Sequence, residues 1–395
     1  MEPKKDWKKQ LLRIGSYVVV AALSSALTLF VFGPSMVNSQ SGKLQELKSV
    51  IQAQYIGEAD EALMDDMAAA AMVAAIGDKW SYYVPAEELQ DILDRNANSY
   101  VGIGVTVQLL EDQSGYTVQR VEPGSPAKEG DIRPGDVVVG VNGKSVSEVG
   151  PEAALNMISG EAGTSVNITV LRDGETLEKT LTRQTILQEV ASGQMLTDTI
   201  GYIQINNFNE RCASETISLF DELEKQGAKA MIFDVRFNPG GYVKEMVQIL
   251  DYLLPEGVLF RSEDYTGYTA EETSDASCKN MPMAVLINSE SYSAAEFFAA
   301  ALKEYDYAIT VGQPTSGKGH FQQLLMLSDG SAVNLSIGRY YTPNGVSLSE
   351  VGGLTPDVPV DVDLDTMDLI YSDSLAPEED AQLQAAVDAL MKETQ

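Results

Sequence analysis

The sequence predicts an α/β protein in several parts: an N-terminal membrane anchor, a helical segment, a domain of short strands with two helices, and an α/β core with a mixed sheet. Three observations lead to this prediction. An almost uncharged run of 20 residues begins at Ile14, short alternating strands follow from Tyr100, and strands alternate with helices beyond residue 199. A chain of 395 residues can form two or three such compact units.

The composition excludes several kinds of partner and site. The chain has 27 Lys and Arg against 58 Asp and Glu, a formal net charge of −31. We therefore expect no nucleic-acid partner, because such binding needs a basic surface. With a single histidine, His320, and two cysteines, we predict no metal site and no cofactor. Cys212 and Cys278 could form a disulfide outside the cytoplasm or remain two buried thiols, and the sequence leaves both open.

The N-terminal region is typical of a membrane anchor. Five basic residues within positions 4–13 precede the apolar run 14–33, which as a helix would span about 30 Å, the thickness of a bilayer core. By the positive-inside rule the N-terminus is cytoplasmic and the chain after about residue 34 is extracytoplasmic. A retained anchor is favoured over a cleaved signal, because residues 33–36 form a poor cleavage site. Residues 1–40 are thus predicted as a cytoplasmic stub and single-pass anchor in the cell membrane.

Residues 41–97 are predicted to be helical. Leu44, Leu47, Val50 and Ile51 recur at three- and four-residue spacing, and an Ala/Met-rich helix follows over Asp65–Ile76. The sequence at 77–79 ends that helix, and a short second helix is expected over 86–94. We find no catalytic signature in this region.

Residues 98–184 show the pattern of a small strand-rich domain. Strands are expected at 100–107, 116–121, 136–141 and 166–170, with hairpin turns at 142–143 and 173–174 and short helices at 125–130 and 151–159. The G-I-G loop at 102–104, the E-P-G-S-P-A run at 122–127 and the block 133–143 resemble a PDZ domain of the bacterial protease-associated kind. This resemblance implies that Gly102, Ile103 and Gly104 bind the carboxylate of a peptide C-terminus.

Residues 185–365 are predicted to form the α/β core. Strands are expected at 199–208, 230–236 and 283–288, and helices at 212–225, 243–253 and 294–302. The polar, acidic stretch 262–280 is expected to be an exposed loop, with a lid as the alternative. In such folds functional sites collect at the carboxyl ends of the strands. Three loops of this chain lie there.

Each of the three loops also has an ordinary structural explanation. In Asp234–Gly241, two glycines after a strand can direct free N–H groups toward developing negative charge. In Ser289–Glu296, Ser293 stands at a helix N-terminus, where it could simply cap the helix with Glu296 completing a capping box. In Ser316–Gln322, Lys318 lies between glycines, although most lysines are merely solvated.

Together the loops resemble the carboxyl-terminal processing peptidases, which combine a PDZ domain with a serine/lysine dyad. The matching motifs are N-P-G-G at 238–241, Ser291–Glu296, and the G-K-G motif at 317–319, and the closing blocks 339–345 and 353–357 also match. The resemblance covers about residues 45–362. Tyr292, Ala295 and His320 depart from the family pattern, the first beside the nucleophile position and the last beside the lysine.

The resemblance implies a serine nucleophile at Ser293 and a general base at Lys318, oriented by Gln322. A serine hydroxyl needs such a base, and burial can lower the pKa of a lysine enough for this role. We expect the oxyanion to be bound by the N–H of Ala294 and one N–H of Gly240 or Gly241. The alternative base is His320, two residues from the lysine.

The expected function is endoproteolysis near protein C-termini outside the membrane, with the PDZ domain binding the substrate tail. The resemblance also implies homodimer contacts through residues 41–97 and the C-terminal helical tail 366–395. One alternative is a catalytically silent, membrane-anchored PDZ scaffold. Another is a hydrolase of lipid or peptidoglycan esters, against which the absence of a G-x-S-x-G motif argues.

Overall fold

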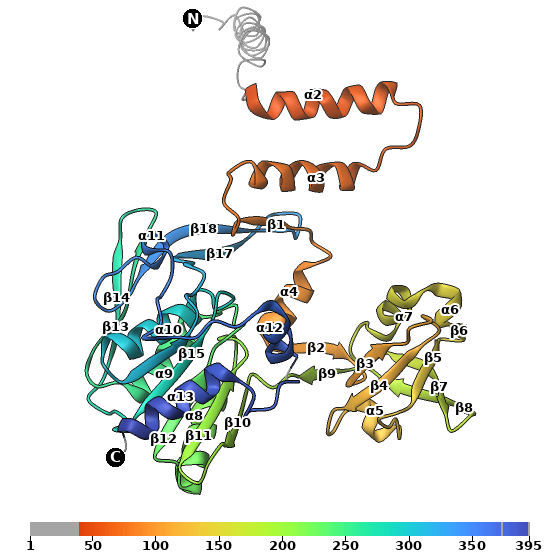
Figure 1. Cartoon of the computed structure of the whole chain (residues 1–395). Helices are drawn as coiled ribbons and strands as arrows, with labels where there is room; N and C mark the ends of the chain where they lie inside the picture. The colour runs from red at the N-terminus through yellow and green to blue at the C-terminus, as the bar shows by residue number, and fades with distance from the viewer. Residues whose placement is uncertain (1–38, 373, 394–395) are drawn as a thin grey trace, which may run out of the picture. The chain divides into compact units, whose positions relative to one another are not determined.

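A computed structural model describes residues 39–372 and 374–393 (Figure 1). The chain divides into two units at Met72. The first contains α2 (Ser39–Gln54) and most of α3 (Glu61–Ala74), with an ion pair of 2.8 Å between Lys48 and Asp65. Between these helices lies an apolar groove, lined by side chains that include Leu44, Leu47, Ile51, Met64 and Met72.

The predicted anchor, residues 14–33, lies outside the described residues. Among the residues that are described, no helix is both long enough and apolar enough to cross a membrane.

The second unit contains a strand-rich domain between residues 99 and 187. Its main sheet has the order β3-β4-β5-β7-β8, and the pair β2–β9 connects the domain to the rest of the unit. Ile103, Val118, Val138 and Ile168 are among the residues of its core. Its elements are β2 (Ser99–Gly102), β3 (Val105–Leu109), β4 (Tyr116–Val121), α5 (Pro126–Glu129), β5 (Val137–Val141), β6 (Lys144–Ser145), α6 (Val146–Val149), α7 (Pro151–Ile158), β7 (Ser165–Arg172), β8 (Glu175–Thr182) and β9 (Gln184–Leu187).

The α/β core of the second unit is built on a mixed sheet. The strands β11, β12, β15, β16 and β19 are parallel, and β10 pairs antiparallel with β11 at the edge. This arrangement confirms the predicted mixed sheet. In order along the sheet, the strands are β10 (Ala191–Met195), β11 (Ile200–Ile205), β12 (Ala230–Asp234), β15 (Met283–Ile287), β16 (Ala308–Gly312) and β19 (Val358–Pro359).

Helices cover both faces of this sheet (Figure 1). On one face, α8 (Cys212–Gln226), α9 (Val243–Leu253) and α10 (Ala294–Glu304) bury a large cluster that includes Phe220, Phe233 and Phe298. On the other face, α13 (Ala381–Glu393) packs Leu383 and Leu390 against the sheet. The central strands β12 and β15 are therefore buried on both faces, as their largely apolar sequences predict. Three short helices complete the unit: α4 (Leu89–Asn96), α11 (Leu348–Val351) and α12 (Leu364–Tyr371).

A second sheet contains two segments whose structure differs from the sequence prediction. The stretch 262–280, expected to be a loop, contributes to a β-hairpin, because its polar residues pair across the strands instead of packing into a core. A short strand also appears within residues 41–97, where only helices were expected, and it pairs antiparallel with β18. The strands are β1 (Tyr82–Val84), β13 (Gly257–Asp264), β14 (Thr269–Ser274), β17 (His320–Met326) and β18 (Ala332–Tyr341).

The two cysteines are both free thiols. Cys212 is buried and Cys278 is exposed. The structure thus has neither the disulfide nor a pair of buried thiols.

Candidate active site

Ser293 lies where the chain passes from β15 into α10. Its backbone has φ 53° and ψ −119°, an unusual conformation for a residue other than glycine, and its exposed fraction is 9%. Non-glycine residues held in such conformations cluster at functional sites. The capping box of Ser293 and Glu296 considered from the sequence is present, and within it the Ser293 N–H donates to the Glu296 carboxylate at 2.8 Å. The backbone is, however, not in the extended conformation that a simple N-cap residue adopts.

The nearby serine, Ser291, has a different environment. It is fully buried, its hydroxyl donates to the Val235 carbonyl at 2.8 Å, and the same oxygen accepts from the Asn288 N–H at 3.1 Å. Because both of these bonds hold the loop together, Ser291 has a structural role.

The glycine loop 234–241 packs directly against Ser293. A Cβ at Gly240 would lie 2.9 Å from the Ser293 Cβ and 3.0 Å from the Ala294 nitrogen, so only glycine fits there. The Gly240 N–H donates to the Asn238 side chain at 2.8 Å. The N–H groups of Gly241 and Ala294 have no acceptor among the residues of the structure that are described. These two N–H groups are therefore available to bind an oxyanion.

The lysine loop is joined to the serine loop by one buried carboxylate. Glu296 is fully buried in the first turn of α10 and makes five hydrogen bonds. Through them, one side chain fixes the start of the helix and the loop that precedes β17. The donors are the N–H groups of Ser293 (2.8 Å), Gly317 (2.7 Å) and Lys318 (2.8 Å) and the hydroxyls of Thr315 (2.6 Å) and Ser316 (3.2 Å).

The Lys318 ammonium group is half-buried and contacts an aromatic ring. Its Nζ lies 4.3 Å from the centroid of the Trp80 ring. Burial lowers the pKa of Lys318 below its ordinary value of 10.5, and the nearby charge of Lys79 lowers it further, while Glu296 and Asp78 oppose the shift. The net lowering brings the lysine closer to the pKa that a general base needs.

Trp80 is a site residue that the sequence analysis missed. It follows the helix break at 77–79, in a region without catalytic motifs. The Asn334 side chain donates to its carbonyl at 3.1 Å, and its ring meets Tyr292 edge-on at 5.7 Å between centroids. Tyr292, which departs from the family pattern, thus packs against the same ring as Lys318. In the sequence, only the position of an aromatic residue just after a helix break could have indicated a role for Trp80.

Gln322 and His320 lie on β17, immediately after the lysine loop. The Gln322 amide donates to the His320 carbonyl at 3.0 Å and to the Ser336 hydroxyl at 3.1 Å. No hydrogen bond joins Gln322 and Lys318 in the described parts of the chain. His320 lines a cavity of about 590 Å³ together with Glu263 and other residues of β13 and β18.

Comparisons with known proteins identify the family of this chain. The model of peptidase family S41 matches residues 199–360, and that of the PDZ domain matches residues 93–171. A carboxy-terminal processing protease of Bacillus subtilis (strain 168) is 31% identical over 367 residues, which cover 90% of this chain and 78% of that protein. This chain belongs to the carboxy-terminal processing proteases. It is a serine peptidase with a PDZ domain, as the sequence resemblance implied.

More distant relatives of this protease are consistent with the assignment. Carboxyl-terminal-processing peptidase 2 of Arabidopsis thaliana, a chloroplastic protein, is 29% identical over 309 residues, covering 74% of this chain and 60% of its own. A solved S41 protease structure from Bacteroides fragilis is 18% identical, with a TM-score of 0.50 over 75% of this chain and 84% of that one. At that identity the structural likeness shows the fold alone.

The PDZ loop of the protease lies between β2 and β3. The Ile103 carbonyl accepts from the Ala127 N–H at 2.9 Å, and the Gly104 carbonyl accepts from the Glu122 N–H at 3.0 Å. The N–H groups of Ile103 and Gly104 find no acceptor within the residues described. Gly102 ends β2, in register with Gln184 of β9. Ile103 and Gly104 are both buried, and their N–H groups are left without a protein acceptor in the described part of the chain.

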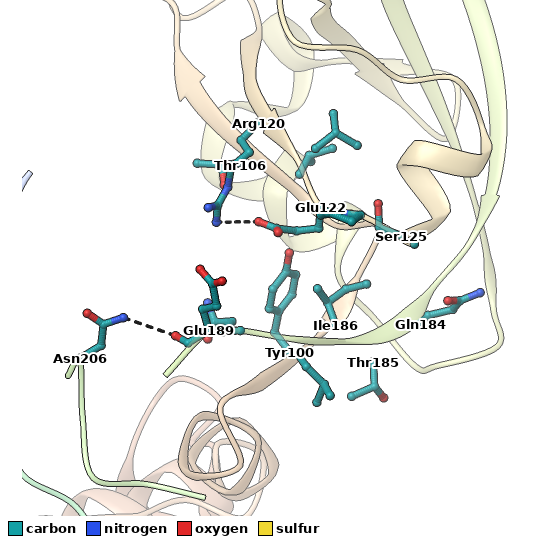
Figure 2. A pocket seen from close by; sticks show the side chains of 16 residues that line it. Tyr100, Thr106, Arg120, Glu122, Ser125, Gln184, Thr185, Ile186, Glu189 and Asn206 are labelled. Carbon is teal, nitrogen blue, oxygen red and sulfur yellow. Dashed lines mark hydrogen bonds and ion pairs between the residues drawn. The ribbon is translucent and has the colours of Figure 1, made fainter. Parts of the chain in front are cut away.

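A cavity of about 1100 Å³ lies beside this loop, between the PDZ sheet and the β2–β9 pair (Figure 2). Figure 2 shows the Arg120 guanidinium against the Glu122 carboxylate, 2.7 Å apart, with the Tyr100 ring below them. In the described residues, no group of three His, Cys, Asp or Glu side chains could hold a metal ion.

Proposed function

We propose that the protease cleaves peptide bonds with a dyad of Ser293 and Lys318. The observation that carries the proposal is the buried Glu296 carboxylate, which binds the backbone of both residues and so fixes their loops together. A shared anchor of this kind is what a nucleophile and its base need, because small displacements between reacting groups greatly slow catalysis.

The steps follow from this arrangement. Ser293 Oγ attacks the scissile carbonyl carbon while neutral Lys318 Nζ takes the hydroxyl proton, and the oxyanion is bound by the N–H groups of Gly241 and Ala294. Lys318 then gives the proton to the departing amine, leaving an acyl-serine. Water attacks this ester, Lys318 again takes and returns a proton, and the new C-terminal carboxylate leaves with Ser293 restored.

Lys318 is a better candidate for the base than His320. Its pKa is lowered by burial and its backbone N–H is bound to the Glu296 carboxylate, which also binds the Ser293 N–H. His320 has no bond to Glu296 and faces the cavity beside β13. In this proposal Gln322 acts by fixing β17 directly after the lysine loop, through its bonds to the His320 carbonyl and Ser336.

Substrate tails bind to the PDZ domain in this proposal. The free N–H groups at Ile103 and Gly104 support capture of a terminal carboxylate. A tethered tail has a raised effective concentration at Ser293, which favours cleavage near protein C-termini. The apolar groove between α2 and α3 supports pairing of two copies through this segment, as the resemblance implies.

The proposed location of the protease is the extracytoplasmic side of the cell membrane. The support comes from the sequence alone: the apolar run 14–33, with basic residues before it, is suited to a single-pass anchor with a cytoplasmic N-terminus. The strong negative charge of the remaining chain supports protein partners over nucleic acids. Fractionation of cells that express the full chain tests the anchor, which predicts recovery in the membrane pellet after a high-salt wash.

Four single variants test the dyad on an unfolded protein substrate. We expect Ser293→Ala and Lys318→Ala to be inactive while folded, since each removes a reacting group. Ser291→Ala and His320→Ala are the matched controls, and each is expected to keep measurable cleavage. Loss of activity in His320→Ala with normal activity in Lys318→Ala would identify the histidine as the base. Activity that persists in Ser293→Ala would refute the nucleophile assignment.

A further inference from the structure

The C-terminal helix contacts the glycine loop through one buried arginine. Arg236, only 6% exposed, forms ion pairs with Asp234 on its own loop and with Asp380, whose Oδ2 lies 2.8 Å from Arg236 Nη2. Its Nη1 also donates to the Gln382 side chain at 3.0 Å. Asp380 and Gln382 belong to the start of α13, more than 140 residues further along the chain.

Arg236 stands five residues before Gly241, whose N–H group has no acceptor among the described residues. Its own N–H donates to Asp234, and the next residue, Phe237, is held at φ 59° with its N–H on the Asn288 side chain at 3.0 Å. A non-glycine residue in this conformation is strained and persists only where its surroundings hold it. The next residue, Asn238, accepts a hydrogen bond from the Gly240 N–H through its side-chain oxygen. A shift of Arg236 would therefore be transmitted directly to the oxyanion donor at Gly241.

α13 is firmly placed on the sheet. Leu383 and Leu390 pack in the same apolar cluster as Ile232 of β12 and Leu286 of β15. The Asp380 carboxylate accepts from the Gln382 and Leu383 N–H groups, so it caps the helix as well as binding the arginine. This helix lies beyond residues 199–360, the part that the peptidase family model matches.

This cluster contains more carboxylates than one ion pair with Arg236 requires. Asp234 alone could neutralise Arg236, yet Asp380 adds a second buried carboxylate, and the Tyr202 hydroxyl donates to Asp234 at 2.8 Å. The carboxylates raise the pKa of Arg236 although its burial opposes the shift. Burying an additional charge is costly, and hydrogen bonds from two sides fix the plane of a guanidinium group. The arrangement therefore favours a precise position over stability alone.

We propose that Asp380 and Gln382 are positioning residues, through which α13 holds the glycine loop in its catalytic shape. The inference rests on the proposed function, in which the Gly241 N–H stabilises the oxyanion. The C-terminal helix thus completes the active site although it supplies no reacting group. Loss of the contact of Asp380 and Gln382 with Arg236 lowers the stabilisation of the transition state and leaves substrate binding in place.

The test is Asp380→Asn, which keeps the size of the side chain and removes its charge. With a short fluorogenic peptide, we expect kcat to fall at least about 10-fold with KM within about 2-fold, because the interaction matters only in the transition state. The inhibition constant of a peptidyl boronate, whose tetrahedral adduct places an oxygen at the oxyanion site, rises by the same factor. Asp380→Glu keeps the charge and is expected to recover part of the activity.

Leu390→Ala is the matched control, because it weakens the packing of the same helix at a position ten residues after Asp380, in the apolar cluster. It is expected to lower the melting temperature while the folded enzyme keeps its kcat. A normal kcat in Asp380→Asn overturns the proposal, and so does an equal loss of kcat in Leu390→Ala. Ser293→Ala distinguishes failure of the proposed function from failure of the positioning role. If Ser293→Ala stays active, the proposed function fails. If Ser293→Ala is inactive while Asp380→Asn is fully active, only the positioning role fails.

Discussion

Replacing Glu296 by glutamine tests the central feature of the site. The two carboxylate oxygens share five donors, two on one oxygen and three on the other. A glutamine can keep only one of these oxygens, because its amide nitrogen is itself a donor. In the orientation that keeps three of the five hydrogen bonds, the glutamine amide nitrogen faces the Thr315 hydroxyl and the Gly317 N–H. The hydroxyl cannot turn freely, since it also accepts from the Leu354 N–H at 2.7 Å.

The expected cost follows from this count. Hydrogen bonds to charged groups contribute about 1.5–3 kcal/mol each, so two lost bonds reduce the free energy of unfolding by about 3–6 kcal/mol. The lysine loop is then released from the start of α10. A displacement of about 1 Å between reacting groups can slow catalysis about 100-fold, and we expect a loss of kcat of this size in Glu296→Gln.

The assay combines thermal unfolding with peptide hydrolysis across a range of pH. Because the Glu296 charge raises the pKa of Lys318, removing it increases the neutral, basic form of the lysine. A loss of kcat that persists at high pH therefore comes from geometry and not from titration. Glu245→Gln is the control, since Glu245 is also a buried glutamate in the first turn of a helix, where it accepts from the Ala213 N–H at 3.0 Å. Glu296→Gln with unchanged melting temperature and kcat would refute the reasoning.

Two further predictions concern pH and the PDZ domain. Since burial lowers the pKa of Lys318, kcat/KM should rise with pH through a midpoint below 10.5. Asp78→Asn should move this midpoint down and Lys79→Met should move it up. Midpoints that move in the same direction in both variants would contradict the assignment. In the PDZ domain, buried Arg183 donates to the last two carbonyls of α7 at 2.7 and 2.8 Å. Arg183→Met should therefore lower the free energy of unfolding of this domain by about 3 kcal/mol, measured by calorimetry. An unchanged unfolding transition of the PDZ domain would contradict this role.

The sequence predicted the parts of the fold whose patterns are local. β12 is fully buried and apolar up to its last residue, Asp234, and α8 and α9 show the spacing of a helix that covers one face of a sheet. The loops after β12 and β15 could be expected to meet, because parallel strands place their carboxyl ends at one edge. The structure brings Gly240 against Ser293, in agreement with that expectation.

Other features depend on contacts between distant segments, which a single sequence does not reveal. The stretch 262–280 appeared to lack core residues, but hairpin strands at a sheet edge need only alternate and pair. The role of Arg236 becomes visible only when α13 brings Asp380 to it across 144 residues. Trp80 reaches Lys318 because β1 pairs with β18, and a strand of three residues is too short to give a periodic signal.

These distant contacts act on the pKa of Lys318 in opposite directions. The Trp80 face and the Asp78 and Glu296 carboxylates favour the ammonium form, whereas burial and Lys79 favour the neutral amine. Burial is the largest influence, so the pKa is lowered, but the opposing groups limit the shift. A base with too low a pKa would accept the serine proton poorly, and one with an unshifted pKa would be almost wholly protonated. The segment that carries Trp80 is therefore part of the chemistry of the site, although it contains no catalytic motif.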